Sequence, residues 1–237
     1  MNPRHRSESN EHYTPKPYVE AARTALGRID LDPATCELAQ RIVRAERHYA
    51  EEHDGFTRVW SGRVFLNPPG GQSDRFQRRV EAHCTRTGSC GLPAPHRHQG
   101  VEPNQTKWWF KLAREHKEGR VPEAVFVAFS VELVQTTQAD APWGLPLPLD
   151  FAIAYPRGRV AYDTPGAHGD RVPSKSPPHA SAFVYLGDRV DAFAQAFRPW
   201  GKVVIPRDRF VLGQLPPPPY REPTSHPDDT ENRFRED

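Results

Sequence analysis

A polar corner closes the apolar stretch at residues 64–71, which read VFLNPPGG. Asn67 is followed by Pro68 and Pro69, and a proline has no backbone N–H to donate. The corner therefore holds two acceptors in fixed directions, the Asn67 side-chain oxygen and the Pro68 carbonyl oxygen. Such a pair can bind both N–H groups of an exocyclic amine on an aromatic ring and stabilise the positive charge that develops when its nitrogen attacks an electrophile. A rigid turn at the end of a strand is the alternative interpretation.

A second corner follows the apolar run at residues 29–33, IDLDP. Asp32 could receive the amino group of an amino-acid-like cofactor. Alternatively, Asp32 caps a helix that begins near Ala34, with Pro33 in a position that favours a helix start. The chain contains no glycine-rich phosphate-binding loop, so nucleoside triphosphates and dinucleotides lack their usual sequence fingerprint.

Two further segments carry candidate residues. Tyr13, Thr14 and Pro15 precede the first expected helix, and Thr14 is a suitable cap for it. A late region combines basic and aromatic residues, a mixture that suits contact with a nucleic-acid backbone and stacking on bases, and equally suits a solvated surface. Its members are Tyr155, Arg157, Arg159, Tyr162, Arg171 and Lys175, followed by His179 in the sequence SPPHAS.

The elements that must position these residues alternate along the chain. Strands are expected at residues 29–33, 63–69, 123–130, 151–156, 158–163, 180–187 and 202–206, and helices at 17–27, 36–50, 107–120 and 188–201. Strands this apolar need cover on both faces, so the pattern predicts an α/β sheet between two helical layers. Ligands of such sheets bind beyond the carboxyl ends of the strands.

The 237-residue chain is expected to form one domain at residues 13–210 between two disordered tails, 1–12 and 211–237. The second tail carries three arginines and six acidic residues, so the rest of the +2 chain is mildly basic, which permits a polyanionic partner. Three cysteines are too few for a disulfide scaffold. No apolar run is long enough to span a membrane and no signal peptide is evident, which predicts a cytoplasmic protein.

An irregular insertion at residues 80–106 interrupts the alternation. The insertion contains cysteine and histidine residues, which are zinc ligands, and four of them could form a tetrahedral site that orders the loop. A loop with free thiols and scattered histidines is the alternative, because the spacing matches no regular zinc-finger pattern. The residues concerned are Cys84, Cys90, His96 and His98, with His83 beside them.

Five motifs in this order and spacing resemble the phage DNA N6-adenine methyltransferase (Dam-type) family. They are YTPKPYVEAARTALGRIDLDPAT, HDGF, WSGRVFLNPPGG, KWWFKLA and SPPHASAFVYLG, and they cover about residues 13–190. The resemblance implies a Rossmann-like sheet of the S-adenosylmethionine-dependent methyltransferases, in a protein encoded by a phage or prophage. It implies transfer of a methyl group to adenine N6 in DNA, whether for protection from restriction or for another purpose.

The resemblance also assigns residues. Asn67, Pro68 and Pro69 correspond to the motif that grips adenine N6. Cofactor contacts are implied for Tyr13, Thr14, Pro15, Asp32, Pro33 and Asp54, and a contact with the base for the position of Gly70. DNA contacts of Arg159, Lys175 and His179 are expected from the composition of the late region itself. Gly70 stands where many members have an aromatic residue that stacks on the flipped base, so stacking here is expected from Phe65 or from a residue of a late loop.

Two other hypotheses remain open. The same chemistry is used on RNA and on protein amides, and the substitution at Gly70 suits a decayed methyltransferase fold that only binds DNA. Binding of S-adenosylmethionine separates the decayed fold from the enzymes.

Overall fold

The computed structural model describes residues 12–69, 105–139, 144–166, 170–173 and 179–206, all of which belong to one compact unit, Met1–Pro206. The helices in this part are α1 (Lys16–Leu26), α2 (Glu37–Val43), α4 (Gln105–Lys117), α5 (Val131–Ala139) and α6 (Val190–Phe197), with short 3-10 helices η1 (Glu51–His53) and η2 (Pro148–Asp150). The strands are β1 (Leu31–Asp32), β2 (Arg47–His48), β3 (Val64–Leu66), β4 (Ala124–Ala128), β5 (Ala152–Pro156), β6 (Asp163–Pro165), β7 (Arg171–Pro173), β8 (Ala182–Leu186) and β9 (Gly201–Val204). No helix in these segments is long and apolar enough to cross a membrane.

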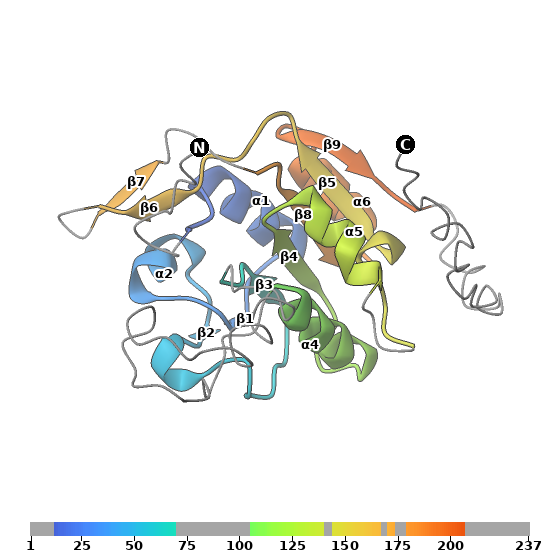
Figure 1. Cartoon of the computed structure of the whole chain (residues 1–237), viewed down its shortest axis with the longest axis horizontal. Helices are drawn as coiled ribbons and strands as arrows, with labels where there is room; N and C mark the ends of the chain where they lie inside the picture. Colours follow the sequence, from blue (N-terminus) through green and yellow to red (C-terminus); the bar gives the residue numbers. More distant parts are fainter. Residues whose placement is uncertain (1–11, 70–104, 140–143, 167–169, 174–178, 207–237) are drawn as a thin grey trace, which may run out of the picture. The chain divides into compact units, whose positions relative to one another are not determined.

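Seven strands form one sheet in the order β2-β1-β3-β4-β8-β5-β9 (Figure 1). The pairs among β2, β1, β3 and β4 are parallel, whereas β8 pairs antiparallel with β4 and with β5, and β9 pairs antiparallel with β5. Five strands therefore point one way, and only β8 and β9 point the other way. This mostly parallel sheet confirms the predicted α/β class and is compatible with a Rossmann-like fold.

Helices cover both faces of the sheet, as the apolar strands predicted (Figure 1). Successive residues of a strand point to opposite faces. Phe65 accordingly packs with α1, α2 and α6, while Val64 and Leu66 pack with α4 and α5. The face on which a residue at a strand end lies is thus fixed by its position in this alternation.

The predicted helix at residues 36–50 is wrong in its second half. Helix α2 ends at Val43, and the chain turns through Arg44 in the left-handed conformation (φ 48°) into β2. The cause is tertiary: the Arg23 guanidinium of α1 donates to the carbonyl oxygens of Ile42 and Val43, both at 2.8 Å. Those carbonyls are then satisfied without a further helical turn.

Three local expectations also need correction. Asp32 does not cap α2, which begins at Glu37, and Thr14 makes no capping bond to α1. Of the strand expected at residues 158–163, only Asp163 lies in a strand, and β6 pairs with β7 in a separate two-stranded sheet. Helix α5 was not expected at all. The predicted stop of α1 at Gly27 is confirmed by its positive φ of 76°.

A charged cluster joins the amino ends of the central strands. The Glu123 carboxylate, just before β4, accepts hydrogen bonds from the Tyr185 hydroxyl at 2.7 Å, from Arg189 at 2.6 and 2.7 Å, and from Arg63 at 3.0 Å. Burial raises the pKa of Glu123, but the bonds from Arg189 and Tyr185 outweigh it, so the net pKa is lowered. Because Glu123 and its partners satisfy one another's hydrogen bonds, we assign this end of the sheet a structural role.

Candidate functional site

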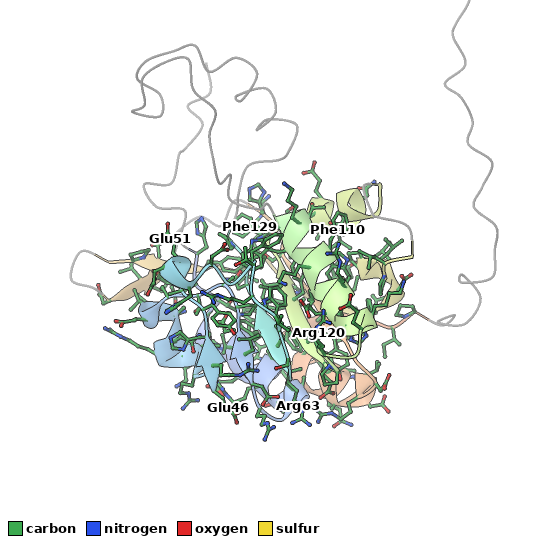
Figure 2. All side chains as sticks on the ribbon, turned by 90° about the horizontal axis from the view of Figure 1, so that it is seen from below. Glu46, Glu51, Arg63, Phe110, Arg120 and Phe129 are labelled. Carbon is green, nitrogen blue, oxygen red and sulfur yellow. The ribbon has the colours of Figure 1, made fainter. Side chains whose placement is uncertain are left out.

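Three side chains follow the carboxyl ends of three adjacent parallel strands. Asp32 ends β1, Asn67 follows β3, and Phe129 follows β4. Strand β8 runs the other way, with Ala182 opposite Ala128, so its amino end lies at the same edge. The residues just before β8, including His179, therefore lie there too. Figure 2 shows Phe129 and Arg63 at opposite ends of the strands. This is the edge at which α/β sheets bind their ligands.

The Asn67 side chain is held by the segment that leads into α1. Its Nδ2 donates to the carbonyl oxygen of His12 at 2.7 Å. The amide nitrogen is therefore directed at the backbone, and Oδ1 is left as the free acceptor, because no described group donates to it. Asn67 is half-buried, so its fixed oxygen lies at the boundary of the core.

Pro68 contributes a carbonyl oxygen next to this amide. The residue is buried, and its carbonyl accepts a hydrogen bond from Gln105 Nε2 at 3.1 Å. A carbonyl oxygen has two lone pairs, so one remains for a second donor. The expected pair of acceptors, Asn67 Oδ1 and Pro68 O, is thus held by hydrogen bonds as well as by the two prolines.

Gln105 has no counterpart among the residues that the sequence pointed to. It is the first residue of α4, its exposed fraction is 8 %, and its Oε1 accepts a hydrogen bond from the backbone N–H of Phe129 at 3.2 Å. Its amide therefore connects the corner after β3 with the end of β4. No sequence signal marks it, because both partners are main-chain atoms far away in the chain.

Aromatic rings surround Phe129 beside this corner. The centroid of the Phe129 ring lies 5.2 Å from that of His12, 5.3 Å from that of Tyr162 and 5.1 Å from that of His179. Burial lowers the pKa of His12, and the nearby His179 lowers it further, so His12 tends to be neutral. His12 also provides the carbonyl that holds Asn67, which places this cluster next to the candidate acceptors.

Phe65, expected as a stacking residue, is unsuitable. It lies inside the sheet, where its exposed fraction is 1 %, and it packs in the core on the α1 face. Phe129, at the end of the neighbouring strand β4, is only half-buried. A signal for it existed in the sequence: Phe129 ends the most apolar strand, at the edge where ligands bind.

Asp32 is a buried carboxylate with neutral partners. It is 2 % exposed and accepts hydrogen bonds from Gln40 Nε2 at 2.8 Å and from the Ala34 N–H at 3.4 Å. Burial raises its pKa to about 7, against the opposing effect of bonds from Thr35, Ala34 and Gln40. No cation pairs with it within the described segments. A cationic group brought to this carboxylate would therefore stabilise its ionised form.

The segment around Asp54 is packed onto the corner at Pro33. A Cβ atom added at Gly55 would overlap the Pro33 carbonyl oxygen and lie 2.9 Å from the Tyr49 Cβ. The Gly55 carbonyl accepts a bond from Trp60 Nε1 at 2.8 Å, which anchors the turn. Asp54 itself is exposed, with a φ of 46°. The structure thus brings the LDP and HDGF motifs together, with the Asp54 side chain on the surface.

The segment from Tyr13 to Pro15 lies against the same edge. Tyr13 and Thr14 are buried, and the Thr14 hydroxyl oxygen is enclosed without a hydrogen-bond partner among the described residues. Arg171 donates to the Thr14 carbonyl at 2.7 Å, pairs with Asp163 at 2.8 Å and lies over the Tyr13 ring. Arg171 therefore fastens this segment and is not available as a DNA contact.

The remaining candidates fall into two groups. Arg159 and His179 are described and exposed, and the His179 ring contacts the ring of Phe129. Six others lie outside the described residues, namely Gly70, Lys175, Cys84, Cys90, His96 and His98. Within the described segments, no group of three or more metal-ligating side chains occurs.

Comparison of the chain with known protein families, with curated proteins and with solved structures gives no match.

Proposed function

We propose that the protein is an S-adenosylmethionine-dependent methyltransferase that modifies the N6 amine of adenine in DNA. The observation that carries the proposal is the pair of fixed acceptors at the carboxyl edge of the sheet, Asn67 Oδ1 and Pro68 O. Asn67 is oriented by the His12 carbonyl and Pro68 by Gln105. A rigid turn alone would not need its side-chain amide held with an oxygen to which no described residue donates.

In the proposed reaction the two acceptors each bind one N–H of the target amine. In free adenine the lone pair of this nitrogen is delocalised into the ring. The two hydrogen bonds hold the amine so that the lone pair points toward the electrophile. Positive charge then develops on the nitrogen, and acceptors that are already in place stabilise it without reorganisation. The methylated nitrogen loses its extra proton afterwards, so the chain needs no strong base at this position.

The residues of the edge fit the cofactor. Asp32 is a buried carboxylate without a cationic partner in the described part of the chain, which suits the ammonium group of an amino-acid moiety. The enclosed Thr14 hydroxyl has no hydrogen-bond partner among the described residues either. Pro33 follows Asp32 directly, and the turn at Asp54 packs against the Pro33 carbonyl through Gly55. Bound S-adenosylmethionine would supply an electrophilic methyl group.

The aromatic cluster suits a base that has left the duplex. Adenine N6 is stacked inside double-stranded DNA, so the base must be flipped out or presented as a single strand. Aromatic rings beside the acceptors can stack on such a base, and Phe129, with His12 and His179 against it, takes the place expected of an aromatic residue at Gly70.

The test is transfer of a labelled methyl group from S-adenosylmethionine to unmethylated genomic DNA. Asn67→Ala removes the side-chain acceptor, and Gln135→Ala, an exposed amide on α5, is the matched control. Label is expected as N6-methyladenine, lowered about 10²- to 10³-fold by Asn67→Ala and unchanged by Gln135→Ala.

Two results would contradict the proposal in different ways. Binding of S-adenosylmethionine without transfer to DNA would indicate an RNA or protein substrate. Absence of cofactor binding would indicate a decayed fold that acts through binding alone.

A further inference from the structure

The side chain of Gln105 joins two main-chain positions that the proposed reaction uses. Its Nε2 donates to the Pro68 carbonyl oxygen at 3.1 Å, and its Oε1 accepts from the Phe129 N–H at 3.2 Å. The exposed fraction of 8 % means that water does not compete freely for these bonds. Both ends of one amide are therefore committed to the corner after β3 and to the end of β4.

We infer that Gln105 is a positioning residue for methyl transfer, which rests on the function proposed above. Its bond to the Pro68 carbonyl uses one lone pair and holds the carbonyl so that the other lone pair accepts from the target amine. Its bond to Phe129 fixes the main chain that carries the ring proposed to stack on the base. Gln105 thereby sets the distance between the acceptor and the stacking ring.

The direction of the amide is essential to this role. Gln105 must donate toward Pro68 and accept from Phe129, since a carbonyl oxygen only accepts and a backbone N–H only donates. A glutamate at the same position keeps the acceptor. When ionised, however, it places a negative oxygen against the Pro68 carbonyl and pushes that carbonyl out of line. When protonated, it regains an O–H donor of similar reach.

The experiment compares wild type, Gln105→Glu and Gln105→Met in single-turnover methyl transfer to unmethylated DNA between pH 5.5 and 8.5. Cofactor affinity and thermal unfolding are measured on the same samples. Burial raises the pKa of a carboxyl group, so the introduced glutamate titrates within this range. Asp32, His12 and His179 are ionisable side chains at the same edge of the sheet. Because wild type contains all three, the ratio of variant to wild-type rate isolates position 105.

At pH 8.5 the Gln105→Glu rate is expected to be about 10²-fold below wild type, and the ratio should rise at least about tenfold toward pH 5.5. The Gln105→Met ratio should be low at every pH. When the DNA concentration is varied, both variants should lose maximal single-turnover rate, with less change in the DNA concentration that gives half of that rate, since positioning acts on the reacting step.

Three results bear on the inference in different ways. A flat Gln105→Glu ratio, in a folded variant that binds the cofactor, would overturn the positioning role and leave the proposed function in place. A Gln105→Met variant as fast as wild type would do the same. Wild type that transfers no methyl group would overturn both proposals together.

Discussion

Asn67 Nδ2 donates a hydrogen bond to the carbonyl oxygen of His12 at 2.7 Å, across 55 positions of the chain. This bond decides that the amide nitrogen faces the backbone and that the oxygen faces away from it. A side chain that could rotate would offer its nitrogen as often as its oxygen, and two donors would then face each other at a bound amine.

Removal of residues 1–12 should lower the rate of methyl transfer about 10- to 100-fold, because Asn67 loses the acceptor that orients it. A variant that lacks only residues 1–9 keeps His12 and should match wild type. His12→Ala removes the imidazole ring and keeps the main-chain carbonyl, so it distinguishes the contribution of the ring from that of the carbonyl. Single-turnover rates for the three variants are the measurement. Equal rates for wild type and the variant without residues 1–12 would contradict the orienting role.

Gly55→Ala should weaken both the fold and cofactor binding. The added Cβ would overlap the Pro33 carbonyl oxygen, so the turn at Asp54 must move away from the corner that Asp32 precedes. The free energy of unfolding should fall by about 2–3 kcal/mol, as measured by denaturant titration. Gly158→Ala is the matched control, because nothing lies within 4 Å of a Cβ built at that position. Similar losses in both variants would show that the contact with Pro33 is unimportant.

Asp32 should make the protein less stable as pH rises from about 4 to about 7. Burial raises the pKa of Asp32 to about 7 in the folded protein, well above its ordinary value of 3.8. The folded state therefore holds the proton over this range while the unfolded state releases it. The resulting stabilisation is complete below about pH 4 and is lost by about pH 7, with a total of up to about 4 kcal/mol.

Asp32→Asn removes this titration. The difference in unfolding free energy between variant and wild type should therefore change across pH 4–7 and level off above pH 7. Denaturant titrations at intervals of half a pH unit are sufficient. A difference that stays constant from pH 4 to pH 8 would mean that Asp32 is ionised throughout.

Affinity for S-adenosylmethionine should rise as pH increases from 5.5 to about 7.5. Over this range Asp32 loses its proton, and only the carboxylate attracts the ammonium group that we propose it binds. Asp32→Asn should bind more weakly at pH 7.5 and vary less with pH. Calorimetric titration of wild type and variant tests this. Equal affinities at every pH would place the amino group elsewhere.

The sequence by itself determined the alternation of strands and helices and the two polar corners. Strands β3, β4, β5 and β8 are short apolar runs with clear ends, so their positions could be read from local composition, whereas the polar β6 and β7 could not. Asn67 and Asp32 lie at the edge where they were expected for the same reason. Proline and glycine act locally, and the stop at Gly27 followed from that residue alone.

Only the tertiary structure decided where α2 ends and what surrounds the corner. Helix α2 stops at Val43 because Arg23 of another helix satisfies its last carbonyls. Helix α5 could have been expected from Ser130, whose hydroxyl accepts from the Leu133 N–H at 3.2 Å, but its polar residues show weak periodicity. Gln105 acts on main-chain atoms 37 and 24 positions away, and such bonds leave no pattern in the sequence.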